Sequence, residues 1–242
     1  MTQVTIERRK IVDIDNQRLK KMIKKILFIS ILSVFTNFAL LTWAYGEEAK
    51  PVPCEEKSDF VLLEVPDVRQ STTYSCGASC LQGILMYWGI EHREGDLIVL
   101  LNTSPDSGTD PEDIVRVAVD KGLKGEIKEN LTIEDLELSI KDGIPVIVAI
   151  QAWRDEQGEP WEKVWEDGHY VIVTGFDGKN IYFEDPSLLG SKGFIEREEF
   201  LSRWHDYSGE PPLDEKDRKY IRLGIFIRGE KPAPPPELLH ID

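Results

Sequence analysis

The chain has 242 residues and a formal net charge of −15, and this charge is divided unequally along it. Residues 1–25 carry eight Lys or Arg against three acids, residues 26–46 are uncharged, and the remainder therefore carries −20. A domain this acidic repels phosphates, so nucleic acid is excluded as the expected partner.

Residues 26–46 form an uncharged, mostly apolar segment that directly follows the basic residues 1–25. Its length is close to the roughly 20 residues that a bilayer requires, and the basic flank predicts a cytoplasmic N-terminus. We expect either a cleaved signal peptide or a retained membrane anchor, and Met22 is an alternative start of the signal. Both alternatives predict an extracytoplasmic location for the rest of the chain, with membrane contact only through the N-terminal segment.

Three regions are expected after the apolar segment. These are a linker over residues 47–58, a single domain over residues 59–230 and a Pro-rich tail over residues 231–242. A domain of about 170 residues is long enough to bury a sizeable core.

The first half of this domain has mainly helical patterns. In this half, one strand is expected, at residues 60–63. Apolar residues at helical spacing predict a helix that starts at Cys76 and ends at Gly89. Thr109 and Glu112 have the spacing of a capping box. Further helices are expected at residues 96–101, at residues 110–121, and from Thr132 to just before Gly143.

The second half has the patterns of β-strands. Residues 146–150 form an apolar run typical of a strand that is covered on both faces. Residues 170–174 and 180–183 flank an Asp177-Gly178 pair, which predicts a hairpin, and a last strand is expected at residues 220–227. The order predicts an α+β domain whose N-terminal helical part packs beside a mostly antiparallel sheet.

Cys76 is the candidate nucleophile. Ser75 is a good helix N-cap, so the cysteine would be the first helical residue. At that position the helix dipole and the unpaired backbone N–H groups favour thiolate over thiol. Three cysteines cannot all pair with one another; a Cys54–Cys80 disulfide would leave Cys76 free, but the spacing does not exclude another pairing. We expect the Cys80 thiol to face the core.

His169 is the candidate base, because it opens a hairpin strand and so lies on a rigid element. A three-residue loop of Phe176, Asp177 and Gly178 would set His169 opposite Asp185, whereas a two-residue turn would set it opposite Pro186. We adopt the first register. Asp185 would then accept a hydrogen bond from the imidazole and fix its tautomer.

Gln70, six residues before Cys76, is the candidate oxyanion donor together with the backbone N–H of Cys76. The predicted reaction is attack of Cys76 on a carbonyl, formation of a thioester, protonation of the leaving amine by His169, and hydrolysis.

The chain resembles the bacteriocin-leader-processing cysteine peptidases of the papain-like superfamily. The residues that carry the resemblance are Gln70 with the Cys76-Gly77 pair, the run from Gly168 to Gly175, and Asp185-Pro186. The resemblance implies a papain-like fold, with Cys76 as nucleophile, His169 as base, Asp185 as its orienting group and Gln70 as oxyanion donor. It also favours the register that pairs His169 with Asp185.

Two features depart from that family. Ser75 stands where the leader-processing members usually have Asp, and the sequence contains no transporter segments. We therefore expect a standalone, exported cysteine peptidase that acts on a peptide or protein substrate, and we do not carry leader processing over. The alternatives are a non-catalytic peptide-binding module of the same fold and an acyltransferase.

Several other residues have less specific patterns. The scattered histidines fit no metal spacing, and neither a metal nor a cofactor is expected. His205 is a second histidine beside a carboxylate, but aromatic packing near a domain edge explains it as well. An insertion that carries three tryptophans forms either one wall of the substrate cleft or an ordinary surface loop anchored by its tryptophans. These are Trp153, Trp161 and Trp165.

Overall fold

The computed structural model describes residues 60–154, 158–188 and 192–234. Contacts divide the chain into two units, Met1–Glu56 and Lys57–Asp242, and every described residue belongs to the second. None of the helices within the described ranges is both long enough and apolar enough to cross a bilayer. The predicted membrane segment, residues 26–46, lies outside those ranges.

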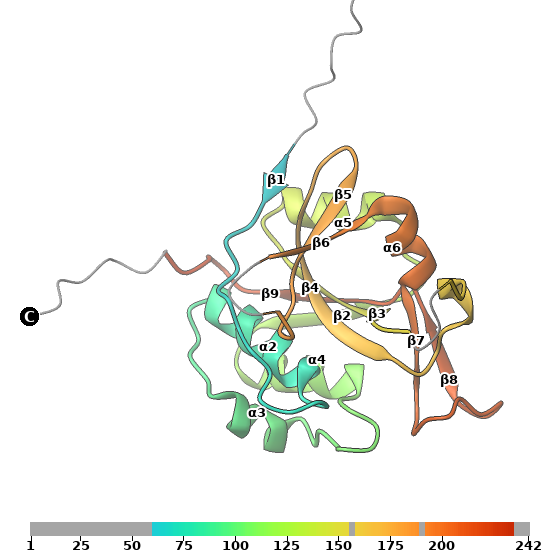
Figure 1. Ribbon diagram of the computed structural model, residues 1–242. Helices are drawn as coiled ribbons and strands as arrows, with labels where there is room; N and C mark the ends of the chain where they lie inside the picture. The colour runs from blue at the N-terminus through green and yellow to red at the C-terminus, as the bar shows by residue number, and fades with distance from the viewer. Residues whose placement is uncertain (1–59, 155–157, 189–191, 235–242) are drawn as a thin grey trace, which may run out of the picture. The chain divides into compact units, whose positions relative to one another are not determined.

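A seven-stranded antiparallel sheet forms the centre of the described domain (Figure 1). Six strands follow the order β2-β9-β3-β4-β5-β6, and β1 pairs with the end of β4 that β3 does not reach. Two further strands form a separate small sheet. The strands of the large sheet are β1 (Val61–Leu62), β2 (Lys124–Lys128), β3 (Val146–Gln151), β4 (Gly168–Phe176), β5 (Asn180–Glu184), β6 (Gly193–Glu196) and β9 (Gly224–Arg228); the small sheet has β7 (His205–Ser208) and β8 (Arg218–Ile221).

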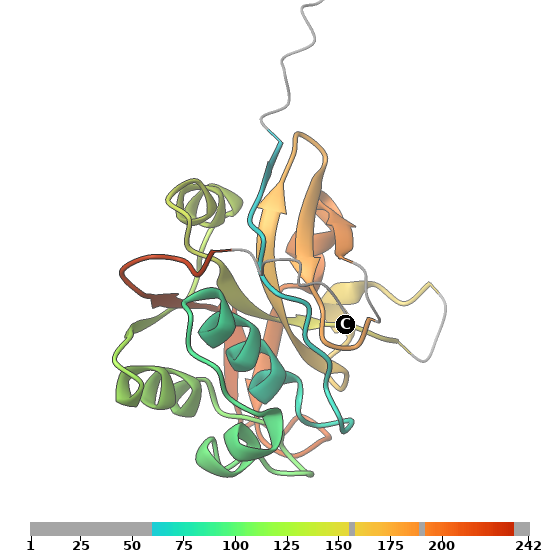
Figure 2. The same cartoon turned by 90° about the vertical axis from the view of Figure 1, so that its left-hand side faces the viewer.

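The helices form two groups, which Figures 1 and 2 show apart from each other. One group comprises α2 (Cys76–Tyr87), α3 (Glu94–Leu100) and α4 (Pro111–Asp120); the other comprises α5 (Ile133–Lys141) and α6 (Arg197–Arg203). A single 3-10 turn, η1 (Trp161–Lys163), follows β3 in the chain.

Both faces of the sheet are buried, because alternate residues of its central strands enter different cores. Ile147 and Ile172 pack with α2, α3 and α4, whereas Val148 and Val171 pack with α5 and α6. All six residues of β3 are buried, as expected for a strand covered on both faces. The predicted α+β class is therefore confirmed.

The predicted helices are present, but two predicted caps differ. Ser75 precedes α2 without capping it, since its Oγ accepts from the Oγ1 hydroxyl of Thr72 at 2.8 Å. The predicted capping box at Thr109 is wrong, because the Thr109 hydroxyl lies 2.8 Å from that of Thr103. A capping box does form at Thr132, whose side chain accepts from the Asp135 N–H.

The strand prediction missed part of the chain. Three strands, β2, β6 and β7, and helix α6 were not predicted. The predicted strand over residues 220–227 is two strands, β8 and β9, because Arg222 between them has a positive φ of 51° that interrupts the extended backbone. Short amphipathic or charged strands of this kind carry a weak periodic signal.

The predicted register of the β4–β5 hairpin is wrong. Phe176 pairs with Ile181, so the loop is longer than three residues. Its length follows from Asp177, whose Oδ1 accepts from the backbone N–H groups of Lys179 and Asn180. A bulge between Val173 and Gly175 shifts the register back by one residue, and the ladder ends at Ile172 and Glu184, before it reaches His169.

Candidate active site

Cys76 begins α2, as the sequence predicted. The first N–H groups of a helix have no intrahelical acceptor and the helix dipole is positive there, so negative charge that develops at this position in a reaction is stabilised. The next residue has to be small, because a Cβ on Gly77 would lie 2.8 Å from the side chain of Thr109. Gly77 therefore allows the loop before α4 to pack closely against the start of α2.

His169 lies in β4, and only 2% of its side chain is exposed. Although the ladder does not pair it with Asp185, its Nε2 lies 2.8 Å from Asp185 Oδ1. The chain turns directly after β5, and the same oxygen accepts from the backbone N–H of Ser187 at 2.8 Å. The turn thus brings the carboxylate back to the imidazole, and the predicted contact between the two side chains is present.

The charges around this contact favour an ionised His169–Asp185 pair. Burial is the largest influence on the pKa of His169 and lowers it, but hydrogen bonds to Asp185 and Cys76 outweigh burial and raise the pKa to about 9. Burial also opposes the charged form of Asp185, because it acts to raise the pKa of this carboxyl group. The hydrogen bond and the charge of His169 outweigh burial, so the pKa of Asp185 is lowered.

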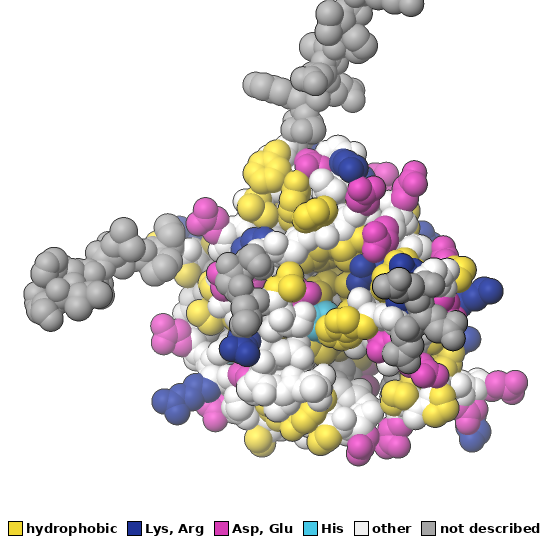
Figure 3. Space-filling model, viewed as in Figure 1, with side chains coloured by type: hydrophobic (Ala, Val, Ile, Leu, Met, Phe, Trp, Pro, Cys, Tyr) yellow, Lys and Arg dark blue, Asp and Glu magenta, His cyan; other side chains and the backbone are white. Residues whose placement is uncertain are grey.

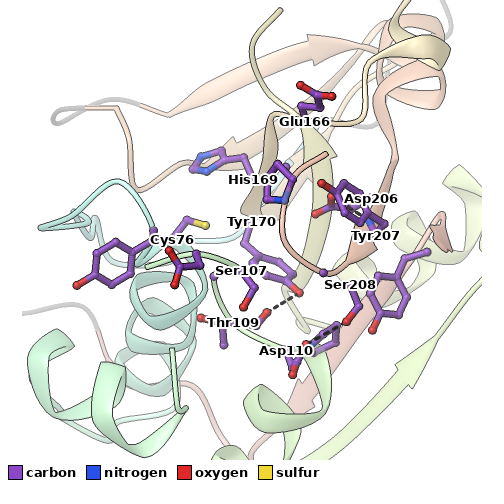
Figure 4. A pocket seen from close by; sticks show the side chains of 18 of the residues that line it. Cys76, Ser107, Thr109, Asp110, Glu166, His169, Tyr170, Asp206, Tyr207 and Ser208 are labelled. Carbon is purple, nitrogen blue, oxygen red and sulfur yellow. Dashed lines mark hydrogen bonds between the residues drawn. The ribbon is translucent and has the colours of Figure 1, made fainter. Parts of the chain in front are cut away.

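Cys76 and His169 share one cavity, which Figure 4 shows from close by. Since Nε2 is engaged by Asp185, Nδ1 is the imidazole nitrogen left for the thiol. The cavity has a volume of about 230 Å³ and lies between the start of α2, the loop before α4, and the strands β4 and β7. On the face drawn in Figure 3, hydrophobic side chains gather near the middle beside a histidine, while charged side chains lie mostly toward the edge.

Gln70 lies near these residues, but its side chain points elsewhere. Its backbone N–H donates to Pro186 O at 3.0 Å, which ties the segment before α2 to the turn that holds Asp185. Its side-chain Nε2 donates to Thr72 O at 2.9 Å, and its buried Oε1 has no hydrogen-bond partner among the described residues. The structure therefore brings Cys76, His169 and Asp185 together and places Gln70 beside them, outside the cavity lining of the described residues.

Comparison with known proteins identifies the family of the chain. The model of the peptidase C39-like family matches residues 62–211. The chain belongs to this family. An uncharacterised protein of Methanothermobacter marburgensis is 27% identical over 121 residues, which are 50% of this chain and 71% of that protein. An uncharacterised protein of Methanothermobacter thermautotrophicus matches with the same identity and coverage.

Solved structures of C39 peptidases have a similar fold. A C39-like peptidase from Bacillus anthracis superimposes with a TM-score of 0.52 and 18% identity, over 72% of this chain and 99% of that one. A double glycine motif protease from an AMS/PCAT transporter, in complex with the leader peptide, matches with a TM-score of 0.47 and 21% identity, over 72% and 95%. The resemblance drawn from the sequence is confirmed, and the fold is that of papain-like C39 peptidase domains.

Two carboxylates of the C39-like domain fix the segment that leads to Cys76. Glu94 accepts from the Ser71 N–H and the Ser79 hydroxyl, both at 2.9 Å. Burial opposes the charge of Glu94, but these hydrogen bonds prevail and lower its pKa. Glu184 is buried and accepts from the Val68 N–H at 2.9 Å and from Lys192 Nζ at 2.6 Å.

The three tryptophans of the insertion have different roles: two lie at the candidate site, and one anchors the surface loop. The Trp153 ring lies 5.0 Å from the His169 ring and covers it, although 52% of Trp153 is exposed. Trp165 lines the cavity. Trp161 instead anchors the loop, because the guanidinium of Arg203 stacks 4.2 Å from its ring.

Two further residues of the C39-like domain, Cys80 and His205, were discussed from the sequence, whereas Asp206 was not selected. Cys80 is a free, fully buried thiol that donates to Tyr170 O at 3.2 Å, and Cys54, its possible disulfide partner, lies outside the described residues. His205 packs 4.4 Å from Trp165, which confirms its structural explanation. Sequence reasoning missed Asp206, a cavity residue beside the catalytic candidates, because a single Asp after a buried histidine has no distinctive pattern.

Proposed function

We propose that the domain is a cysteine peptidase that hydrolyses a peptide bond of a peptide or protein substrate through a thioester on Cys76. The observation that carries the proposal is the series of contacts from Asp185 through His169 to Cys76 at one cavity. Membership of the peptidase C39-like family supports the same reaction class.

The first half of the reaction forms the thioester. His169 holds the proton of the Cys76 thiol as an imidazolium, and the Cys76 thiolate attacks the carbonyl carbon of the scissile bond, so that an S–C bond forms and negative charge develops on oxygen. The Cys76 N–H is one donor for this oxyanion, and the Gln70 amide would have to turn from Thr72 O toward the cavity to supply the other. The C–N bond then breaks, and His169 gives its proton to the leaving amine.

The second half regenerates the enzyme. His169 takes a proton from a water molecule, the resulting hydroxide attacks the thioester, and the S–C bond breaks to release a carboxylate product. Asp185 keeps the imidazole oriented toward the sulfur throughout, and Trp153 covers the ring from solvent.

Selective alkylation tests the nucleophile. Iodoacetamide at about pH 7 should modify Cys76 in the full chain and spare Cys80, which is fully buried. The modified residue is identified by mass mapping. His169→Ala should remove the selectivity, and unchanged labelling in that variant would contradict the pairing of the two side chains.

Digestion of a peptide library tests the reaction. The wild-type chain should produce new amino termini, and Cys76→Ala should produce none. Peptide binding without cleavage by the wild type would indicate a non-catalytic binding module. Products joined to an added amine would indicate an acyltransferase.

We also propose that the domain acts outside the cytoplasm. The basic residues 1–25 and the apolar residues 26–46 support this location. Protease added to intact producing cells should digest the domain, and mass spectrometry of the mature N-terminus should distinguish a cleaved signal from an anchor. A domain that is protected until the cells are lysed would refute export.

A further inference from the structure

The cavity beside Cys76 is lined by acidic groups. Its described lining contains four carboxylates and neither Lys nor Arg, and its volume of about 230 Å³ is several times the roughly 30 Å³ share of a water molecule. Figure 4 shows Cys76 and Asp206 at opposite sides of the pocket, with His169 between them. The four carboxylates are Asp106, Asp110, Glu166 and Asp206.

Asp206 is the most deeply placed of these carboxylates, because it packs against the backbone next to His169. A Cβ on Gly168 would lie 2.5 and 2.6 Å from its two carboxylate oxygens. Its Oδ1 accepts from the Tyr207 N–H at 2.9 Å and from Gln151 Nε2 at 3.3 Å. Its Oδ2 accepts no hydrogen bond from any residue in the described ranges, so half of the carboxylate remains available to a ligand.

A second polar group at the same end of the cavity also lacks a partner. The hydroxyl of Tyr207 is buried and makes no hydrogen bond within the described part of the chain. A buried hydroxyl without a partner costs free energy, but this oxygen is closed off from solvent, so Asp206 Oδ2 is the acceptor that a ligand can reach.

The cations near Asp206 are engaged elsewhere. Arg218 on β8 forms ion pairs with Glu112 and Glu129, and Lys219 lies 5.0 Å above the Trp165 ring. Burial raises the pKa of Asp206 to about 7, and hydrogen bonds from Tyr207 and Gln151, with the charge of His169, offset burial only in part. The protein thus supplies too little positive charge to hold this carboxylate fully ionised at neutral pH.

We propose that this cavity selects substrates with a Lys or Arg side chain close to the scissile bond, and that Asp206 is the specificity-determining carboxylate. A basic side chain supplies both the missing positive charge and a donor for Asp206 Oδ2. The proposal rests on the proposed function, because it places the substrate across Cys76.

Matched peptides test the selectivity. The peptides differ at one position near the cleaved bond, which carries Lys, its uncharged analogue norleucine, or Glu. The full chain at pH 8, where Asp206 is ionised, should cleave the Lys peptide with a kcat/KM at least about tenfold higher than that of the norleucine peptide. The Glu peptide should be the poorest substrate, because like charges repel.

Asp206→Asn should remove this preference. The amide oxygen can keep the hydrogen bonds from Tyr207 and Gln151, so the fold is expected to persist, whereas the charge is lost. The kcat/KM of the Lys peptide should fall at least about tenfold, and that of the norleucine peptide should stay nearly constant. Glu198→Gln removes one charge from an exposed position on α6 and should leave the preference unchanged. An equal loss on all peptides would instead make Asp206 a positioning residue for His169, and would overturn the proposal.

Binding to Cys76→Ala separates the two proposals. If the wild type cleaves no peptide but Cys76→Ala binds the Lys peptide more tightly than the norleucine peptide in calorimetry, the peptidase reaction is refuted and the cationic site stands. If the peptides are cleaved and bound irrespective of their charge, the reaction stands and the cationic site is refuted.

Discussion

At the scale of single residues, His169 lies between a carboxylate and a thiol that both favour its charged form. Burial alone would keep the imidazole neutral, but the hydrogen bonds to Asp185 and Cys76 raise its pKa to about 9. The raised pKa means that His169 stays protonated at neutral pH and loses its proton as the pH rises through about 9. A reaction that needs the thiolate–imidazolium pair should decline over the same range.

Substitution of Asp185 tests this electrostatic argument. Asp185→Asn keeps a hydrogen-bond acceptor but removes the charge, so the pKa of His169 should fall and the alkaline limb of kcat/KM should move to lower pH. Asp185→Ala should in addition lower kcat at least about tenfold, because the imidazole loses its orientation. The measurement is a pH profile of peptide hydrolysis, with Asp120→Asn at the end of α4 as control. An alkaline limb that stays in place in both Asp185 variants would contradict the argument.

Gly168 tests the close approach between β4 and Asp206. Gly168→Ala would place a methyl group 2.5 Å from a carboxylate oxygen, and should lower the free energy of unfolding by about 1–3 kcal/mol. Gly95→Ala in α3 is the matched control, because a Cβ there meets no atom within 4 Å. It should raise stability by about 0.5–1 kcal/mol, as Ala is the better helix former. Urea unfolding measures both, and equal effects would refute the steric explanation.

At the scale of elements, the segment between β1 and α2 is fixed mainly by side chains from distant parts of the chain. Lys192, before β6, donates to Val65 O at 2.6 Å and contacts both Asp67 and the buried Glu184. Glu184 in turn accepts from Val68 N–H. These contacts position an irregular segment that has no hydrogen-bond ladder of its own after β1 and that leads directly to the candidate nucleophile.

Removal of the Lys192 charge should therefore weaken this segment. Lys192→Met leaves Glu184 buried without its cation, and should lower the free energy of unfolding by about 1–3 kcal/mol. Lys179→Met is the control, because its ion pair with Glu196 is exposed at both ends and should not contribute measurably. Chemical denaturation of both variants gives the comparison. A Lys192 variant as stable as the control would show that the buried contact contributes little.

At the scale of the whole molecule, the site lies where the helical part meets the sheet, and this determines how much could be predicted. Local patterns were sufficient for the start of α2 and for the apolar strands β3 and β4, because propensity and burial act together there. The β4–β5 register was not predictable by counting, because hydrogen bonds of Asp177 set the turn and a bulge within the ladder shifted the pairing again. Asp185 nevertheless reaches His169 through the turn after β5.

The sequence by itself determined the class of fold, the family and the candidate residues Cys76, His169, Asp185 and Gln70, because nucleophile, base and helix start are encoded by residue type over short spans. Only the tertiary structure decided which groups surround them. It turned the Gln70 amide toward Thr72, left Cys80 free, and placed Asp206 against Gly168 in the cavity. These contacts join segments far apart in the chain, and packing between elements sets them, which no local pattern records.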